Sequence, residues 1–192
     1  MPLLADQTPL AVVGERLCTD LVDVTDDPAC LDGTGFWAAV VPYTGSPTFA
    51  RFATVRPARP WPGARWPGPP ASAWCSSLDQ GPFEAGVRSV REAIAAGDVY
   101  QVNLTRLLSA PVVPDADVAA LGAALAVGNP APYSAVVRVP SHGIHVASAS
   151  PERFLRREGR LVWSSPIKGT AATPEGFLPK DRAENVMIVD LV

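Results

Sequence analysis

The sequence predicts an α+β protein built largely from antiparallel sheets, with helices packed on the outside. Two observations support this fold class. Short runs of β-branched and aromatic residues alternate with turns in the first third of the chain, and two segments with helical periodicity are inserted among later strand-like runs. Locally paired strands with inserted helices fit α+β better than a doubly wound parallel sheet. With 192 residues, 47% of them hydrophobic, the chain can form one packed core.

The first third of the chain predicts strands separated by turns. The β-prone runs lie at residues 17–24, 35–43 and 48–55. Thr44-Gly45-Ser46-Pro47 separates the last two runs and predicts a hairpin connection. Six prolines in the fourteen residues 57–70 exclude a helix and a central strand, so an exposed connection is expected there. We therefore distinguish a β-rich N-terminal part, residues 1–80, from a second part, residues 81–192.

A change to helical spacing marks the start of the second part. Apolar residues recur at Phe83, Val87, Val90 and Ile94. Pro82 stands near the start of this pattern and Gly97 follows its end, as is typical of helix termini. An amphipathic helix is therefore predicted.

Residues 99–108 predict a strand with one polar face. Tyr100, Val102 and Leu104 alternate with three polar residues, Gln101, Asn103 and Thr105. The apolar set is expected to face a core, and the amides and hydroxyl on the other face are candidates for lining a pocket.

The rest of the chain alternates predicted helices and strands. An Ala-rich helix is expected from about Asp115 to Val127, before Asn129-Pro130. The further elements are strands at 133–139 and 144–149, a hairpin around Glu158-Gly159, and a helix from Asp181 to Val192.

Composition excludes several classes of function. The net charge of −3 and the pI of about 5.3 provide no basic surface for nucleic acid, so a small-molecule ligand is expected. The first residues lack a basic segment followed by a long apolar one, and no later run has membrane-spanning length, so we expect a cytoplasmic protein without a membrane partner. Cys18, Cys30 and Cys75 show no CxxC spacing and are interpreted as buried free thiols.

Four short segments place ionisable or amide groups in apolar, strand-like surroundings. They are Tyr100-Gln101-Val102-Asn103-Leu104, Ser150-Pro151-Glu152-Arg153-Phe154, Ser165-Pro166-Ile167-Lys168-Gly169-Thr170 and Asp181-Arg182-Ala183-Glu184-Asn185. In this order, with Asn129-Pro130-Ala131-Pro132-Tyr133, they resemble the chorismate-utilising enzyme family, which includes anthranilate, aminodeoxychorismate, isochorismate and salicylate synthases. The resemblance covers about residues 83–192. It implies that residues 81–192 are the first part of a chorismate-binding catalytic region.

Two positions separate the branches of this family. The Pro-Ile-Lys-Gly-Thr form around Lys168 is similar to the aminodeoxychorismate synthases, whereas anthranilate synthases generally carry Ala in place of the lysine. The isochorismate and salicylate synthases use a lysine where this chain has Gln101. The resemblance therefore implies the component I activity of the aminodeoxychorismate branch, which converts chorismate and ammonia to 4-amino-4-deoxychorismate for para-aminobenzoate and folate synthesis. Anthranilate synthase component I is the alternative activity.

Lys168 is the candidate nucleophile, and one of only two lysines among sixteen basic residues. A lysine attacks only when it is neutral, and at a pKa of about 10.4 roughly one in a few thousand is neutral at pH 7. Burial or nearby positive charge must lower that pKa, and Pro166 and Ile167 provide an apolar setting. By the resemblance, Lys168 adds to ring carbon C2 as the 4-hydroxyl leaves, and ammonia then displaces it. The alternative is an exposed lysine in a salt bridge.

Glu152 is the candidate general acid. Donating a proton near pH 7 requires a carboxyl pKa raised from about 4.3 toward neutrality. The alternative is an ion pair with Arg153, Arg156 or Arg157. Further candidates for substrate binding are Gln101, Asn103, Arg153, Gly169 and Thr170.

Glu184 resembles a magnesium ligand of the family, where Mg²⁺ holds a substrate carboxylate. Its alternative role is in a capping box with Asp181 at a helix start. The chain has no nucleophilic cysteine in a glycine-rich elbow with a histidine partner, so a glutamine amidotransferase subunit or domain is expected to supply ammonia.

The chain stops within a motif that continues in relatives, at Val189-Asp190-Leu191-Val192. We therefore expect one incomplete domain that lacks a second magnesium carboxylate and further substrate contacts, and that is inactive alone. Two hypotheses follow: a fragment or half of a split enzyme, or a non-catalytic remnant that acts as an interaction module.

Overall fold

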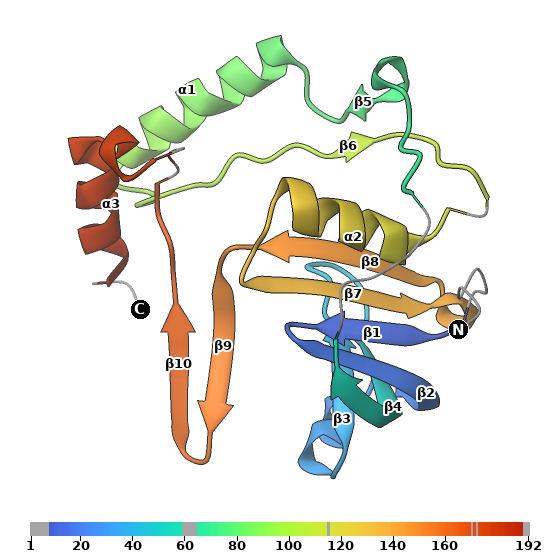
Figure 1. The fold of residues 1–192 in the computed structure, drawn as a ribbon. Coiled ribbons are helices and arrows are strands. Elements are labelled where there is room, and N and C mark those ends of the chain that lie inside the picture. The colour runs from blue at the N-terminus through green and yellow to red at the C-terminus, as the bar shows by residue number, and fades with distance from the viewer. Residues whose placement is uncertain (1–7, 59–64, 115, 170, 172, 190–192) are drawn as a thin grey trace. The chain divides into compact units, whose positions relative to one another are not determined.

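The computed structural model describes residues 8–58, 65–114, 116–169, 171 and 173–189 (Figure 1). Internal contacts divide the chain into two units. The first unit consists of residues 1–66 and 117–192, and the second consists of residues 67–116.

A six-stranded antiparallel sheet forms the body of the first unit (Figure 1). Its strands are β1 (Leu10–Val13), β2 (Arg16–Thr25), β3 (Phe36–Val40), β4 (Thr48–Pro57), β7 (Tyr133–Val139) and β8 (Ile144–Ser150), in the spatial order β3-β4-β2-β1-β7-β8. β1 joins the early strands to the late ones, since Ala11 lies opposite Cys18 of β2 and Leu10 opposite Arg138 of β7. All these strands except β1 were predicted, because four residues are too few to show a clear alternation.

Apolar side chains are buried in two clusters on this sheet. The larger cluster comprises Ala11, Cys18, Ala38, Ala50, Phe52, Val137 and Val139. The second comprises Leu10, Val118, Ala119 and Val136, where α2 (Val118–Gly128) packs on β7 and β8 (Figure 1). The helix predicted from Asp115 is confirmed but begins at Val118, because the Asp117 side chain accepts a hydrogen bond from Ala119 N at 2.9 Å and caps it.

A separate hairpin and a final helix complete the first unit. β9 (Arg153–Glu158) pairs with β10 (Leu161–Ser165) around Gly159, whose φ of 57° is the left-handed conformation that a tight turn needs. α3 (Pro179–Val189) follows a short 3-10 turn at Pro174–Gly176. Both elements were predicted from the sequence.

The second unit contains the predicted amphipathic helix. α1 (Gln80–Ala96) ends at Gly97, which has a φ of 81° and whose N–H caps the carbonyls of Ala93 and Ile94. A short ladder joins β5 (Cys75–Ser76) to β6 (Leu108–Ser109). The strand predicted over residues 99–108 is wrong for 99–107: no strand of the described chain pairs with this segment, and alternation alone does not supply a partner.

The three cysteines are free, but they differ in burial. Cys18 is buried, and this burial raises the pKa of its thiol. Cys30 is partly buried and Cys75 is exposed, so the expectation of buried thiols is wrong for Cys75. Within the described residues, no helix is both long and apolar enough to cross a membrane.

Candidate functional site

The β9–β10 hairpin brings two of the sequence motifs together. Arg153 lies opposite Ser165 in the ladder, so Glu152 and the segment leading to Lys168 leave the hairpin from the same open end. The Glu152 backbone is fixed in the turn after β8, where Ser150 Oγ donates to Glu152 O at 2.8 Å and accepts from Glu152 N at 3.3 Å. The sequence-predicted acid is thus held by its backbone while its side chain is exposed.

The ion-pair alternative for Glu152 is wrong, because each candidate arginine contacts another group. Arg156 pairs with Glu158, and Arg157 Nε donates to Gly159 O at 3.0 Å. The Arg153 guanidinium carbon lies 5.0 Å from the centre of the Tyr133 ring. In the part of the chain that the structure describes, Glu152 forms no ion pair and no hydrogen bond links it to Lys168.

α3 holds the Lys168 segment. Asn185 Nδ2 donates to Lys168 O at 2.8 Å and to Asp181 O at 2.8 Å. Lys168 itself is half-buried, and it forms no salt bridge among the described residues, which contradicts the salt-bridge alternative. The candidate nucleophile is therefore anchored through its backbone.

Gly169 needs to be glycine at this contact. Its φ is 78°, and a Cβ added here would lie 2.8 Å from Asp181 Cβ and 3.1 Å from the Phe177 ring. The positive φ and the close approach each disfavour any other residue. The structure thus gives Gly169 a backbone role beside α3, and its expected role in substrate binding stays a prediction.

The capping-box alternative for Glu184 is wrong in register. α3 begins at Pro179, so Asp181 is its third residue, and the buried Asp181 carboxylate accepts from Leu178 N at 2.8 Å. In a capping box, the third helical residue accepts a hydrogen bond from the residue before the helix. Asp181 has this role here, whereas the alternative assigned it to Glu184. Glu184 lies one turn further along α3 and is half-buried.

Glu184 offers one carboxylate on α3 as a candidate magnesium ligand. Among the residues described, no group of three or more His, Cys, Asp or Glu side chains could hold a metal ion. Mg²⁺ usually keeps several waters and takes one or two carboxylates together with substrate oxygens. A single carboxylate is compatible with such a site, and the role of Glu184 as a magnesium ligand stays a prediction.

Two of the predicted binding residues belong to the second unit. Gln101 is half-buried there and Asn103 is exposed. The next residue along this segment, Leu104, packs against Gly86 of α1. A Cβ added to Gly86 would lie 2.9 Å from Leu104 Cδ2. Tyr100 is 63% exposed, so the expected burial of the apolar face of this segment is not found in the unit. Thr170, the last predicted binding residue, lies outside the described residues.

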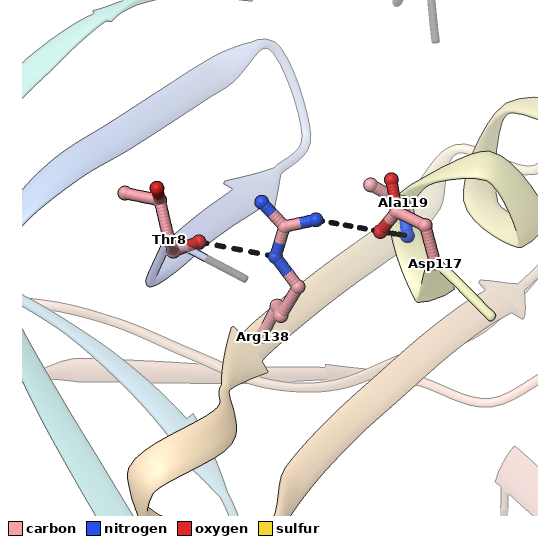
Figure 2. A network of polar contacts seen from close by, with 4 residues as sticks. All are labelled: Thr8, Asp117, Ala119 and Arg138. Carbon is pink, nitrogen blue, oxygen red and sulfur yellow. Dashed lines mark hydrogen bonds and ion pairs between the residues drawn. The ribbon is translucent and has the colours of Figure 1, made fainter. Parts of the chain in front are cut away.

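Sequence reasoning missed a buried charge network in the first unit (Figure 2). Arg138 of β7 is 2% exposed; its Nη1 lies 2.6 Å from Asp117 Oδ1, and its Nε donates to Thr8 O at 3.0 Å. The network ties the segment before β1 and the cap of α2 to the end of β7 (Figure 2). The available signal was a single arginine inside the apolar run 133–139.

The antiparallel sheet, the hairpin with an acid at its open end, and a lysine segment anchored on a helix have the fold and motif order of a chorismate-binding enzyme. A family model described as chorismate binding enzyme matches residues 62–192. The chain belongs to this family.

Curated relatives come from two branches of the family. The chain is 38% identical to anthranilate synthase component 1 1 of Haloarcula marismortui over 123 residues, 57% of this chain and 24% of that protein. It is 36% identical to aminodeoxychorismate synthase component 1 of Klebsiella aerogenes over 133 residues, 63% of this chain and 29% of that protein. It is 43% identical to aminodeoxychorismate synthase of Streptomyces pristinaespiralis over 122 residues, 55% of this chain and 16% of that protein.

The matched segment thus spans less than a third of the length of each of these relatives. The comparison with solved structures gave no match.

Proposed function

We propose that the protein is the chorismate-acting component of an aminodeoxychorismate synthase, in which an amino group from ammonia replaces the 4-hydroxyl of chorismate. The observation that carries this proposal is Lys168: it is half-buried, it forms no ion pair among the described residues, and α3 holds its backbone. Such a lysine suits covalent catalysis, because its amine is not engaged by a carboxylate and its backbone is held in place.

In the proposed reaction, the neutral Lys168 Nζ forms a bond to C2 of the ring while the bond from C4 to the hydroxyl breaks. Glu152 donates a proton to the departing oxygen, which leaves as water. Ammonia then bonds to C4, and the bond between C2 and Lys168 breaks. The sum is chorismate and ammonia giving aminodeoxychorismate and water.

The other named residues bind or orient the substrate. Arg153 lies beside Glu152 at the open end of the hairpin, where its guanidinium can pair with a substrate carboxylate. The Glu152 side chain is exposed, so bound substrate would supply the burial that a general acid requires. Gly169 and Thr170, and separately Gln101 and Asn103, remain candidates for contacts with the substrate.

Glu184 is proposed to hold magnesium together with the substrate. When bound, the cation supplies positive charge that offsets a carboxylate of chorismate. The proposal is supported by the position of Glu184 on α3, the helix whose Asn185 bonds to Lys168 O.

Anthranilate synthase is the second candidate function. It is supported by the relatives, since the identity to an anthranilate synthase component, 38%, is similar to the 36% found for an aminodeoxychorismate synthase component. The two activities differ in the position of the new amino group, so the product distinguishes them.

The test is to incubate the protein from the complete open reading frame with chorismate, Mg²⁺ and ammonium, and to identify the product by mass and chromatography. We expect aminodeoxychorismate, and we expect Lys168→Ala to abolish it or to release an anthranilate-forming activity. Lys180→Ala is the matched control, because Lys180 is the other lysine of the chain and its side chain is 76% exposed. Anthranilate from the unaltered protein, or full activity in Lys168→Ala, would contradict the proposal.

A further inference from the structure

We infer that Asn185 is a positioning residue for Lys168, an inference that rests on the proposed function of Lys168 as nucleophile. The carboxamide of Asn185 has two N–H donors, and both are directed at carbonyl oxygens. One oxygen belongs to Lys168 and the other to Asp181, four residues earlier on α3. The second bond fixes the rotation of the carboxamide, so the first is presented to Lys168 in one direction.

A steric contact from the same face of α3 reinforces this bond. Asp181 and Asn185 are four residues apart and therefore adjacent on the helix surface. The backbone of Gly169 lies against Asp181 Cβ so closely that even a methyl group has no room. Asp181 is itself buried and fixed by its bond to Leu178 N. The Lys168-Gly169 peptide is thus held by two contacts: the hydrogen bond from Asn185 to Lys168 O and the packing of Gly169 against Asp181.

Through these contacts, α3 fixes the position of the Lys168 backbone, from which the side chain extends. α3 also carries Glu184, the residue next to Asn185 in sequence. One rigid helix therefore fixes both the nucleophile segment and the proposed magnesium ligand, which keeps their separation constant. Catalysis is sensitive to such placement, because a shift of about 1 Å in a reacting group can lower the rate about 100-fold.

The test compares substitutions at Asn185 in the complete protein. Asn185→Leu keeps the approximate shape and removes both donors, whereas Asn185→Gln keeps the amide on a longer side chain. We expect Asn185→Leu to lower kcat about 100-fold while the KM for chorismate changes less than about threefold. Asn185→Gln is expected to recover at least about tenfold of this loss. Arg182→Leu, an exposed position on the same helix, controls for substitution in α3 and is expected to keep normal turnover.

The outcomes separate this inference from the proposed function. Loss of activity in Lys168→Ala together with normal kcat in Asn185→Leu would overturn the positioning role alone, whereas full activity in Lys168→Ala would overturn the proposed function. An equal loss in the Leu and Gln variants, with a matching fall in thermal stability, would show a purely structural role and would also overturn the inference. If Asn185→Leu does not fold, Asn185→Asp, which keeps the shape and removes both donors, is measured in its place with the same two criteria.

Discussion

The buried charge of Arg138 makes the stability of the first unit depend on its partners. Its guanidinium lies in the interior of the first unit and has one carboxylate partner, Asp117, with Thr8 O as a further acceptor. Removing one member of a buried pair leaves the other charge without compensation, which typically costs about 3–5 kcal/mol, whereas exposed pairs contribute about 0–1 kcal/mol. Asp117 also caps α2, so one side chain has two structural roles.

We predict that Asp117→Ala lowers the free energy of unfolding by about 3 kcal/mol or more. Asp27→Ala is the matched control, because Asp27 accepts a hydrogen bond from Ala29 N at 2.9 Å in the same way but on an exposed turn without an arginine. Its loss is expected to cost about 1 kcal/mol. Urea unfolding of both variants measures the difference, and equal losses would mean that Arg138 needs no carboxylate.

For Glu152→Gln, which keeps the shape of the side chain but does not donate a proton in the same way, we predict a loss of at least about 100-fold in kcat. The KM for chorismate is expected to stay nearly constant, because proton donation is needed only in the transition state. Steady-state kinetics of the complete protein measures both constants. A variant that loses affinity but keeps kcat would show that Glu152 positions the substrate.

Among the secondary-structure elements, α2 lies very close to the sheet at Gly122. A Cβ at this position would overlap Cγ2 of Val136, a buried, β-branched side chain with little freedom to move. The helix can lie this close to β7 only because residue 122 has no side chain.

Gly122→Ala is therefore predicted to destabilise the protein by about 1–3 kcal/mol, although alanine favours helices by about 1 kcal/mol over glycine. Gly128→Ala, in the same helix but with open space around it, is predicted to be neutral or stabilising. Thermal unfolding of the two variants gives the comparison. A stabilised Gly122→Ala variant would show that α2 can move away from β7 without loss.

α3 also carries Glu184, the proposed magnesium ligand. Loss of a residue that only supports a metal ligand already weakens metal binding about 10–100-fold, so removing the proposed ligand itself in Glu184→Ala should raise the Mg²⁺ concentration for half-maximal activity at least about tenfold. Glu175→Ala, an exposed glutamate in the turn before α3, serves as control and should leave the requirement unchanged. A Glu184→Ala variant with an unchanged Mg²⁺ requirement, or with activity independent of Mg²⁺, would contradict the role of Glu184.

Local sequence patterns predicted most helices and strands. They did not predict which residues distant in sequence pair or form hydrogen bonds. The hairpin around Gly159 and the helix ending at Gly97 follow from turn and cap chemistry within a few residues. The segment 99–107 shows clean alternation but forms no strand, because pairing depends on a neighbour that the pattern does not encode. Similarly, Lys168 and Glu184 were identified from their motifs, but the bond from Asn185 that holds the Lys168 segment joins residues 17 positions apart.

For the protein as a whole, the proposed reaction requires a source of ammonia. None of the three cysteines stands in a glycine-rich elbow, and the two histidines, His142 and His145, flank a turn. Two relatives carry the word component in their names, which implies a second component for those proteins. We extend this to the present protein as a proposal: a glutamine amidotransferase subunit or domain supplies the ammonia.

We accordingly predict that the complete protein, purified alone, forms product from ammonium at alkaline pH but not from glutamine at neutral pH. Adding the amidotransferase partner is expected to restore the use of glutamine, because the partner releases ammonia next to the active site. Product formation is followed by chromatography under both conditions. Glutamine use by a purified protein that has no amidotransferase domain of its own would overturn the need for a partner.

The place of β1 in the sheet also has a consequence for how the chain folds. Residue 10 pairs with residue 138, and the whole 67–116 unit lies in the loop that this pairing closes. Contacts of such high sequence separation raise the contact order, and folding slows as contact order rises. During synthesis, β2, β3 and β4 can pair while β1 still has an open edge, and β7 reaches that edge only after a further seventy or so residues have left the ribosome, at about 5–20 residues per second. For several seconds the nascent chain therefore exposes an unpaired strand edge, which is the kind of surface that chaperones bind and that aggregation begins from.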